Sequence, residues 1–329
     1  MKEHAIELFS ALGERLRDFG LNTETQQIIA EACRANNWFS PREICRAVEA
    51  ITERMLRREV LEAWLSAYSV PVAAPRRILV IMAGNIPLVG FFDLLCVVAA
   101  GHRCVIKPSG KDTVLMQYIV ETLRAIDPHV AIEFHDGPSA VDAVIATGSN
   151  NARRHFQARY AGIPALLRGH RQSVAVLSGR ETPEQLAGLA DDLWAYSGLG
   201  CRNVSRLFLP EGYRLRLPMP PMNPKFRNDY LRTRALLTMT GQPFVDLGCA
   251  VAVEQDGFPT SLSRIAYTYY RDLSETEAWL AAHDDEIQCV VTEAVAHSRR
   301  AGFGCAQSPA LTDWPDDRDV MAWLTREVE

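Results

Sequence analysis

Apolar side chains recur at helical spacing through the first part of the chain. In residues 6–16 and again in residues 44–56, they stand three or four positions apart, with polar residues between them. This spacing predicts helices across residues 3–66. A short stretch bounded by prolines, residues 71–75, then separates these helices from the rest of the chain.

The pattern changes after residue 77, where short apolar runs replace helical spacing. Residues 78–82 are continuously apolar, which is typical of a strand buried in a parallel sheet. Similar runs follow, each separated from the next by a helical pattern, and this alternation indicates βαβ units. We expect strands at 78–82, 102–107 and 141–147, and helices ending near 100, at 113–126 and beginning near 150.

The second half of the chain contains a strong helix start. Thr182 can cap a helix, Pro183 suits its first position, and Gln185 completes a capping box. This helix is expected to end at 198–200, and the four prolines of 216–224 predict a loop. We further expect helices near 228–240, 275–284 and 316–326, and strands near 249–253, 263–269 and 287–292.

Composition and charge narrow the class of protein. The 329 residues suffice for about two domains, and 48% of them are apolar. The formal net charge of -5, without a basic block, argues against nucleic acid as a partner. No apolar run reaches 18 residues, so we expect no membrane span. The N-terminus lacks the features of a signal peptide, so we expect a cytoplasmic protein.

The eight cysteines predict thiols rather than a metal site or a disulfide framework. None forms a CxxC pair, and no His and Cys cluster has the spacing of a zinc site. Most of them are expected to be small buried core residues.

Four segments carry candidate chemistry, and we expect each at the carboxyl end of a strand, where parallel sheets bind ligands. Asn85 lies in a strand-to-helix turn where its amide can point into a cleft, although a simple turn asparagine is an alternative. Lys107, followed by Pro108 and Ser109, ends a strand and can reach a nucleotide, although a solvated lysine is equally compatible.

The other two segments follow later in the chain. Thr147, Gly148 and Ser149 precede a helix whose N-terminus suits a phosphate, but they lack the GxGxxG spacing and also fit a generic tight turn. Cys201 follows Gly200 and precedes Arg202, so its sulfur can be exposed and its thiolate favoured by a cation, although a buried cysteine is the alternative.

Taken together, these segments resemble the LuxC-like acyl-CoA reductases, a branch of the aldehyde dehydrogenase superfamily. The resemblance extends from about residue 35 to residue 329. It rests on IMAGNIPLVGFFD (81–93), HRCVIKPSGKD (102–112), AVIATGSNNARRHF (143–156), RQSVAVLSGRET (171–182), GLGCRNVSRLFLP (198–210) and FGCAQSPALTDWPDD (303–317).

The resemblance implies a role for each matched residue. It implies that Cys201 is the acyl-accepting nucleophile and that Asn85 is the oxyanion-hole asparagine. It also implies that NADPH or NADH is the cofactor and that the adenosine ribose binds Lys107. The cofactor residues implied are Lys107, Pro108, Ser109, Thr147, Gly148 and Ser149, and no metal is implied.

The resemblance also implies an α/β fold, with a Rossmann-type parallel-sheet cofactor domain, an α/β catalytic domain and an N-terminal helical segment. The expected divisions are an N-terminal helical segment at 1–70, a cofactor-binding domain at 71–178, a catalytic domain at 179–290, and a C-terminal segment at 291–329 that returns toward the cofactor domain.

The implied reaction is reduction of an acyl thioester to an aldehyde, with coenzyme A or a carrier protein as the leaving group. An acyl-transferase or synthetase partner and a homo-oligomer are compatible with it. Two other functions stay open: aldehyde oxidation, and a noncatalytic scaffold subunit of a lipid or polyketide assembly. The choice between NADPH and NADH is open too, since Lys111 or Arg153 can meet a 2′-phosphate.

Two departures from the superfamily pattern bear on the reaction. Residues 166–171 contain no carboxylate where aldehyde dehydrogenases carry a general-base glutamate. Residues 254–258 do not match the segment that holds the ribose-binding glutamate. The first departure favours reduction over hydrolysis of an acyl-enzyme, because water attack needs a base.

Overall fold

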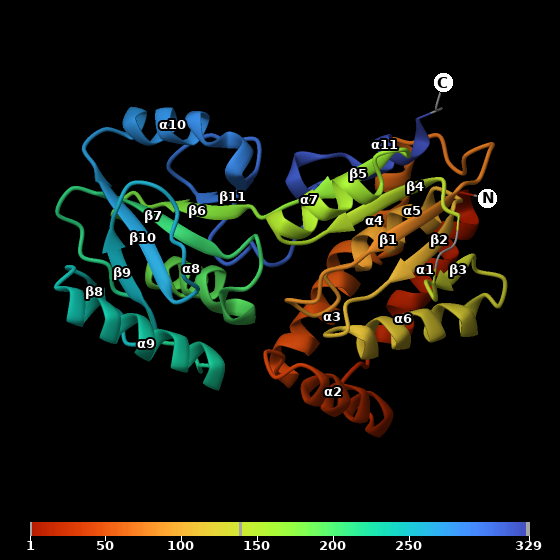
Figure 1. Cartoon of the computed structure of the whole chain (residues 1–329), viewed down its shortest axis with the longest axis horizontal. Coiled ribbons are helices and arrows are strands. Elements are labelled where there is room, and N and C mark those ends of the chain that lie inside the picture. The colour runs from red at the N-terminus through yellow and green to blue at the C-terminus, as the bar shows by residue number, and fades with distance from the viewer. Residues whose placement is uncertain (1, 138–139, 327–329) are drawn as a thin grey trace. The chain divides into compact units, whose positions relative to one another are not determined.

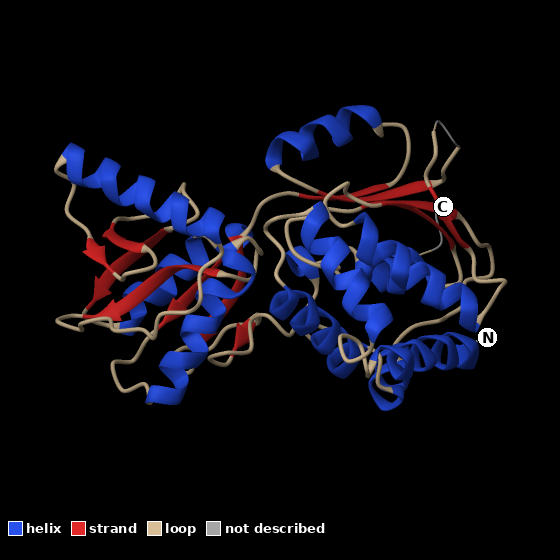
Figure 2. Cartoon of the chain, turned by 90° about the horizontal axis from the view of Figure 1, so that it is seen from below, coloured by secondary structure: helices blue, strands red, loops and turns tan. Residues whose placement is uncertain are grey.

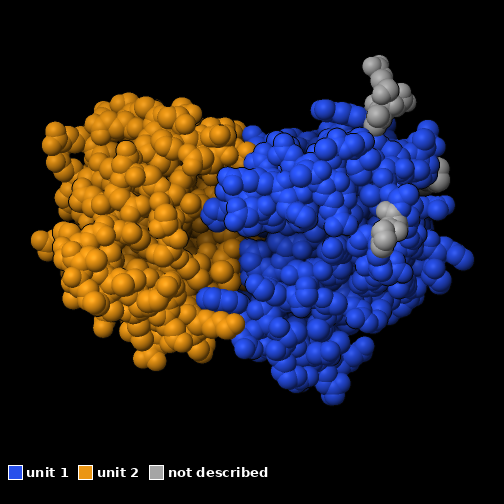
Figure 3. All heavy atoms as spheres, in the orientation of Figure 1, with its two compact units in different colours: residues 1–170, 309–329 blue, residues 171–308 orange. Residues whose placement is uncertain are grey.

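The computed structural model describes residues 2–137 and 140–326, and it divides the chain into two compact units. Unit 1 comprises residues 1–170 and 309–329, and unit 2 comprises residues 171–308 (Figure 3). The predicted boundaries at 178 and 290 lie within unit 2, so the compact units divide the chain at other positions than the expected domains.

Four helices form the beginning of unit 1, as the apolar spacing predicts. They are α1 (Lys2–Leu16), α2 (Thr23–Ala35), α3 (Pro41–Met55) and α4 (Arg58–Ser66). Side-chain caps set two of the starts: Asn22 accepts from the Thr25 N–H, and Ser40 accepts from the Glu43 N–H.

A five-stranded parallel sheet is the centre of unit 1 (Figure 1). Its strands are β1 (Arg77–Ile81), β2 (Arg103–Lys107), β3 (Ile132–Phe134), β4 (Ala143–Thr147) and β5 (Ala165–Arg168). They lie in the order β3-β2-β1-β4-β5 and every pair is parallel. The predicted parallel sheet is therefore confirmed, with the short strands β3 and β5 added at its edges.

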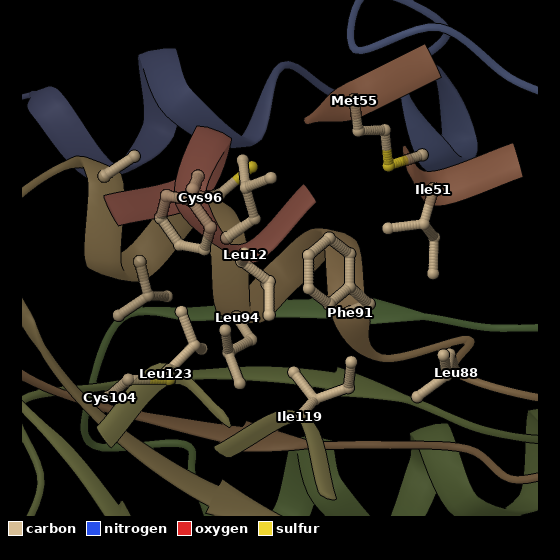
Figure 4. Packing of buried hydrophobic residues seen from close by; sticks show 14 of the residues in the cluster. Leu12, Ile51, Met55, Leu88, Phe91, Leu94, Cys96, Cys104, Ile119 and Leu123 are labelled. Atoms are coloured by element: carbon tan, nitrogen blue, oxygen red, sulfur yellow. The ribbon is translucent and has the colours of Figure 1, made fainter. Parts of the chain in front are cut away.

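Helices cover both faces of this sheet (Figure 2). The alternation of β1 explains the two layers: Ile78 and Val80 pack with the N-terminal helices, whereas Leu79 and Ile81 pack in a cluster on the other face. Figure 4 shows the larger core, in which Leu12, Phe91 and Ile119 come from three different helices. The remaining helices of unit 1 are α5 (Phe91–Ala99), α6 (Thr113–Ile126), α7 (Asn150–Arg159) and α11 (Val320–Thr325), with a 3-10 turn η3 (Pro315–Asp317).

Unit 2 is built on a second, seven-stranded sheet in the order β12-β11-β6-β7-β10-β9-β8. All neighbours are parallel except the edge strand β8, which runs antiparallel to β9. Its strands are β6 (Gln172–Val176), β7 (Val204–Pro210), β8 (Val245–Asp246), β9 (Val251–Glu254), β10 (Arg264–Tyr270), β11 (Ile287–Thr292) and β12 (Arg300–Ala301). Its helices are α8 (Pro183–Trp194), α9 (Pro224–Thr240) and α10 (Leu273–Ala282), with 3-10 turns η1 (Ala195–Gly198) and η2 (Asp284–Glu286).

The predictions for unit 2 are confirmed for its helices and incomplete for its strands. The capping box at Thr182 is present, although α8 ends at Trp194 and η1 completes the segment. The proline-rich loop is confirmed up to Asn223, after which Pro224 begins α9. Strands β6, β7, β8 and β12 are not among the predicted strands. In β7, Arg206 interrupts the apolar run, although this residue is fully buried.

Among the described residues, no helix has both the length and the apolar character that crossing a membrane requires.

Candidate active site

Three of the four predicted segments lie along the carboxyl edge of the sheet in unit 1. Asn85 follows β1, Lys107 ends β2 and Thr147 ends β4. Since β2 and β4 flank β1 on opposite sides, the strand order reverses beside β1. In open α/β sheets, ligands bind outside the carboxyl ends of the strands at such a switch point.

The loop that carries Asn85 is held at both ends by buried side chains. The Asn36 side-chain amide donates to the Gly84 carbonyl at 3.3 Å, and the Asp112 carboxylate accepts from the Leu88 N–H at 2.8 Å. Leu88 itself has a left-handed backbone, with φ at 55°, which residues with side chains rarely adopt. The position of Asn85 is therefore fixed by the residue that follows α2 and by the residue that precedes α6.

A close approach between two loops also requires glycine at position 84. A Cβ added to Gly84 would lie 2.6 Å from Cβ and Oγ of Ser109. The loop after β1 and the turn after β2 therefore pack backbone against side chain. Any larger residue at position 84 would push apart the segments that carry Asn85 and Lys107.

Asp112 is almost fully buried, and burial raises the pKa of its carboxyl group to about 8. The hydrogen bond from the Leu88 N–H acts in the opposite direction and lowers this pKa. Near neutral pH the carboxyl group is therefore mainly protonated, so that the loop is held by a neutral group.

The turn after β2 leaves Lys107 at the surface. Its side chain is exposed, while Pro108 and Ser109 are half-buried. The Ser109 carbonyl accepts from the Thr113 hydroxyl at 3.0 Å, which fixes the turn into α6. This is an exposed cation on a rigid turn, as binding of an anionic or polyhydroxylated group requires.

The turn after β4 leads directly into a capped helix. The Ser149 hydroxyl accepts from the Ala152 N–H at 3.2 Å and caps α7. A Cβ on Gly148 would lie 2.9 Å from the Cβ of Ala152, so only glycine lets the turn lie this close to the helix. The N-terminus of α7 thus follows Thr147 closely, in the place where parallel sheets bind phosphate groups.

A buried ion pair lies beside this turn. Arg168 Nη1, at the end of β5, donates to both carboxylate oxygens of Asp93 at 2.7 and 2.8 Å, and it lies 3.4 Å from the Thr147 hydroxyl. Both side chains are only 4% exposed. Asp93 belongs to the first turn of α5, so the pair ties the end of β5 to the helix that follows β1.

Cys201 lies in unit 2 and is exposed, unlike four of the described cysteines, which are buried. The expectation that all four segments lie at carboxyl ends is wrong here. Cys201 follows η1 and precedes β7, so it lies at the amino end of that strand. The physical reason is that a helix between two parallel strands brings the chain back to the amino end of the next strand. Cys201 lies in the turn that connects α8 and η1 to the start of β7.

The turn around Cys201 is tightly held. The Asn203 side chain accepts from the Gly200 N–H at 2.8 Å, and the Ser173 hydroxyl donates to the Cys201 carbonyl at 2.9 Å. Tyr196 and Ser197, just before the turn, have left-handed backbones with φ of 52° and 56°. The nucleophile candidate is therefore carried by a constrained segment.

A second exposed thiol, Cys305, lies in a loop that packs against α8. The buried Asp192 carboxylate accepts from the Gly304 N–H at 2.6 Å and from the Ala306 N–H at 3.0 Å. A Cβ on Gly188 would lie 2.8 Å from the Gly304 nitrogen, so helix and loop meet backbone to backbone.

Arg206 holds residues 254–258, the segment that does not match the ribose-binding glutamate segment of the superfamily. The guanidinium of this residue donates to the Gln255 carbonyl at 2.9 Å and to the Gly257 carbonyl at 2.6 Å, and it stacks 4.4 Å from the Trp279 ring centroid. Burial lowers the pKa of Arg206 to about 10, so it stays a cation at neutral pH. Its contacts are structural ones within unit 2.

The structure thus brings seven of the eight predicted site residues to one sheet edge of unit 1 and places the eighth, Cys201, in unit 2. Sequence reasoning gave no role to Asn36, Asp93, Asp112 and Asn203. Asp93 had a visible signal, a lone carboxylate in an otherwise apolar helix, which needs a partner when buried. Within the described residues, no group of three or more His, Cys, Asp or Glu side chains can hold a metal ion.

Comparison with protein families gives a match over more than half of the chain. The family model described as Acyl-CoA reductase (LuxC) matches residues 17–216, a range that includes Asn85, Lys107, Thr147 and Cys201. No curated protein matches the sequence.

Solved structures of aldehyde dehydrogenases share the fold. An aldehyde dehydrogenase from Bacillus cereus, in complex with NAD+, superposes with a TM-score of 0.63 at 13% identity, over 89% of this chain and 72% of that one. An oxidoreductase from Marinobacter aquaeolei gives 0.69 at 12% identity, over 94% and 79%. An acetylating aldehyde dehydrogenase from Geobacillus thermoglucosidasius gives 0.63 at 12% identity, over 94% and 84%. At these identities the likeness defines the fold alone, which is that of the aldehyde dehydrogenases.

Proposed function

Because the chain belongs to the LuxC acyl-CoA reductase family, we propose that it reduces an acyl thioester of coenzyme A or of a carrier protein to the aldehyde, with NADPH or NADH. Membership in this family makes the chain an oxidoreductase that acts on aldehyde or acyl groups. The proposal adds the thioester substrate, the cofactor and a cysteine nucleophile.

The observation that carries the proposal is Cys201, an exposed thiol in a constrained turn inside the range that matches the family. In the proposed first step, its thiolate attacks the thioester carbonyl carbon. A new carbon–sulfur bond forms, the bond to coenzyme A breaks, and the departing thiolate takes a proton from solvent. The product is an acyl-cysteine, as covalent catalysis requires.

The attack places negative charge on the carbonyl oxygen. The proposal assigns two donors to this oxyanion, the Asn85 side-chain amide and the Cys201 backbone N–H. Removal of one such donor typically costs about 100- to 1000-fold in rate. The hold of Asn36 and Asp112 on the loop of Asn85 supports this role, because a donor that is already fixed needs no reorganisation.

The carboxyl edge of the unit 1 sheet fits a nicotinamide dinucleotide. Lys107 is exposed and can donate to a ribose hydroxyl. The capped start of α7 at Ser149 presents backbone N–H donors for a pyrophosphate, and Gly148 lets the turn lie close to the helix. The residues proposed to hold it are Lys107, Pro108, Ser109, Thr147, Gly148 and Ser149. When bound, the dinucleotide supplies the hydride that brings the acyl group to the aldehyde level. Cleavage of the bond to Cys201 then releases the aldehyde and regenerates the thiolate.

The absence of a carboxylate in residues 166–171 favours reduction over hydrolysis. Hydrolysis of an acyl-cysteine needs water activated by a base, which typically contributes about 100- to 10,000-fold. Without that base the acyl-enzyme should persist until it is reduced or until a thiol attacks it, since thiols are stronger nucleophiles than water.

The test adds acyl-CoA without reduced cofactor and follows free coenzyme A and free fatty acid together. We expect a burst of coenzyme A near about one equivalent per Cys201, followed by little further release. Addition of NADPH or NADH should then release aldehyde, and acyl-CoA substrates of different chain lengths identify the preferred one. Steady hydrolysis to the acid would favour the oxidative reaction, and no coenzyme A release from any thioester would reject the proposal.

A further inference from the structure

Three successive peptide groups around Cys201 each make a hydrogen bond. The Gly200 N–H donates to Asn203 Oδ1 at 2.8 Å, and the Gly200 carbonyl accepts from the Asn203 N–H at 3.1 Å. The Cys201 carbonyl accepts from the Ser173 hydroxyl at 2.9 Å. Because each peptide group is planar, one bond per group fixes its orientation. The Cys201 N–H belongs to the middle group, which the Asn203 backbone N–H orients, while the Asn203 side chain holds the peptide group before it.

Asn203 also ties this turn to the end of α8. Its side-chain nitrogen lies 3.0, 3.4 and 2.9 Å from the carbonyl oxygens of Asp192, Leu193 and Ala195. Carbonyls at the end of a helix lack partners within the helix, so a side chain must satisfy them when they are buried. Asn203 is 4% exposed, and its amide thus bonds on one side to the helix and on the other to the turn.

The segment between these two attachments is strained. Tyr196 and Ser197 adopt left-handed backbones that residues with side chains rarely occupy. Such conformations persist where the surrounding structure holds them, and they concentrate at functional sites. Asn203 makes hydrogen bonds to the chain both before and after the strained residues. It therefore restrains both ends of the segment that leads to Cys201.

We propose that Asn203, together with Ser173, is a positioning residue that holds the Cys201 backbone for the transition state of acyl transfer. This inference rests on the proposed function, which names acyl transfer as the first step. Neither residue needs to touch the substrate. Their effect is on the direction of the Cys201 N–H and on the place of the nucleophile, and a misplacement of about 1 Å can cost roughly 100-fold in rate.

The test compares two reactions of the same sulfur in Asn203→Ala and Ser173→Ala. One is acylation by acyl-CoA, which forms an oxyanion, and the other is alkylation by iodoacetamide, which does not. Both are followed on the Cys201 peptide by mass spectrometry, so that Cys305 does not contribute. We expect Asn203→Ala to slow acylation about 10- to 100-fold and alkylation less than about threefold. Ser173→Ala, the milder variant, should slow acylation about 3- to 10-fold.

The control is Tyr270→Phe. The Tyr270 hydroxyl donates to the Leu177 carbonyl at 2.6 Å in the same sheet, so its loss removes a buried hydrogen bond without touching the turn. This variant should keep both rates. Equal slowing of acylation and alkylation in the Asn203 and Ser173 variants, or unchanged acylation, would overturn the inference.

Hydrogen exchange supplies a second readout. The Gly200 and Asn203 amide protons should be protected in the wild type, and the Gly200 proton should exchange at least about 10-fold faster in Asn203→Ala but not in Tyr270→Phe. Unchanged exchange would also overturn the inference. Failure of the proposed function is distinct, because it appears in the wild type as the absence of acylation by any thioester.

Discussion

Two exposed thiols compete for the role of nucleophile at the residue scale, and their surroundings differ. Cys201 lies in a turn whose neighbouring peptide groups are fixed and which follows a strained segment. Cys305 lies in a loop held on α8 through the buried Asp192. Buried polar contacts hold both loops, so neither exposure nor local order distinguishes the two cysteines as nucleophile candidates. The family match distinguishes them, because it includes Cys201 and ends before Cys305.

Cys201→Ala should abolish the burst of coenzyme A and the formation of aldehyde, because no thiolate remains to accept the acyl group. Cofactor affinity should stay within about twofold, because the proposed cofactor residues belong to unit 1. The matched control is Cys305→Ala, which should retain the burst. A burst that survives in Cys201→Ala and disappears in Cys305→Ala would move the nucleophile to Cys305.

Lys107→Ala should weaken binding of the reduced cofactor by about 1–3 kcal/mol, the usual contribution of a charge-assisted hydrogen bond. Acylation of Cys201 without cofactor should be unaffected. Lys111→Ala is the matched control, an exposed lysine four residues further along the same turn. Titration with NADH and with NADPH separates the two: a loss confined to NADPH in the Lys111 variant would place that lysine at the 2′-phosphate, and unchanged affinity in the Lys107 variant would contradict its role.

The loop after β1 is the element whose state depends on pH. Asp112, whose carboxyl group holds Leu88, has a pKa that burial raises to about 8, whereas an aspartate in the unfolded chain has an ordinary pKa of 3.8. The folded protein therefore keeps a proton between about pH 4 and 8 that the unfolded chain has lost. By linkage, this contribution to stability is complete below about pH 4 and is lost as the pH rises through 8.

Asp112→Asn should remove this pH dependence, because the amide is neutral at every pH. We expect the variant to gain stability relative to the wild type between pH 5 and 8, by at most about 1.4 kcal/mol per pH unit. Urea unfolding at pH 5, 6, 7 and 8 measures the difference, with the exposed Asp18→Asn as the control. Parallel pH curves for Asp112→Asn and the wild type would show that the carboxyl group does not titrate in this range.

The strands also show which elements can be predicted from the local sequence pattern. β1, β2 and β4 were predictable because each is an apolar run that ends in a turn. β7 was not, because it contains Arg206, whose burial depends on carbonyls of residues 255 and 257 and on the ring of Trp279. The same limit applies to the site. The turn residues Asn85 and Cys201 are visible in sequence, and Asn203 lies beside Cys201, whereas the other side chains that hold the two turns, Asn36, Asp112 and Ser173, come from distant segments.

At the scale of the whole molecule, unit 1 is made of two separate parts of the chain. The last part supplies α11, whose Val320, Met321 and Leu324 lie in the main core beside α5. The Leu324 carbonyl also accepts from Arg76 Nη2 at 3.0 Å. The returning segment is therefore structural for unit 1.

Leu324→Ala should destabilise the protein by about 2–5 kcal/mol, because it leaves a cavity in a fully buried position. Leu236→Ala is the matched control: this leucine of α9 is 53% exposed, and its loss should cost less than about 0.5 kcal/mol. Thermal or urea unfolding of both variants gives the comparison, and a Leu324→Ala cost as small as that of Leu236→Ala would refute the structural role of α11.

The division of unit 1 has a consequence for biosynthesis. The ribosome makes residues 1–170 first, but the leucine that closes their core arrives only after all 138 residues of unit 2. The last helix of unit 1, α11, is complete 155 residues after residue 170, which takes about 8–31 s at roughly 5–20 residues per second. Unit 2 is continuous and can finish folding in that interval. Unit 2 can therefore be complete before unit 1, although its synthesis starts later.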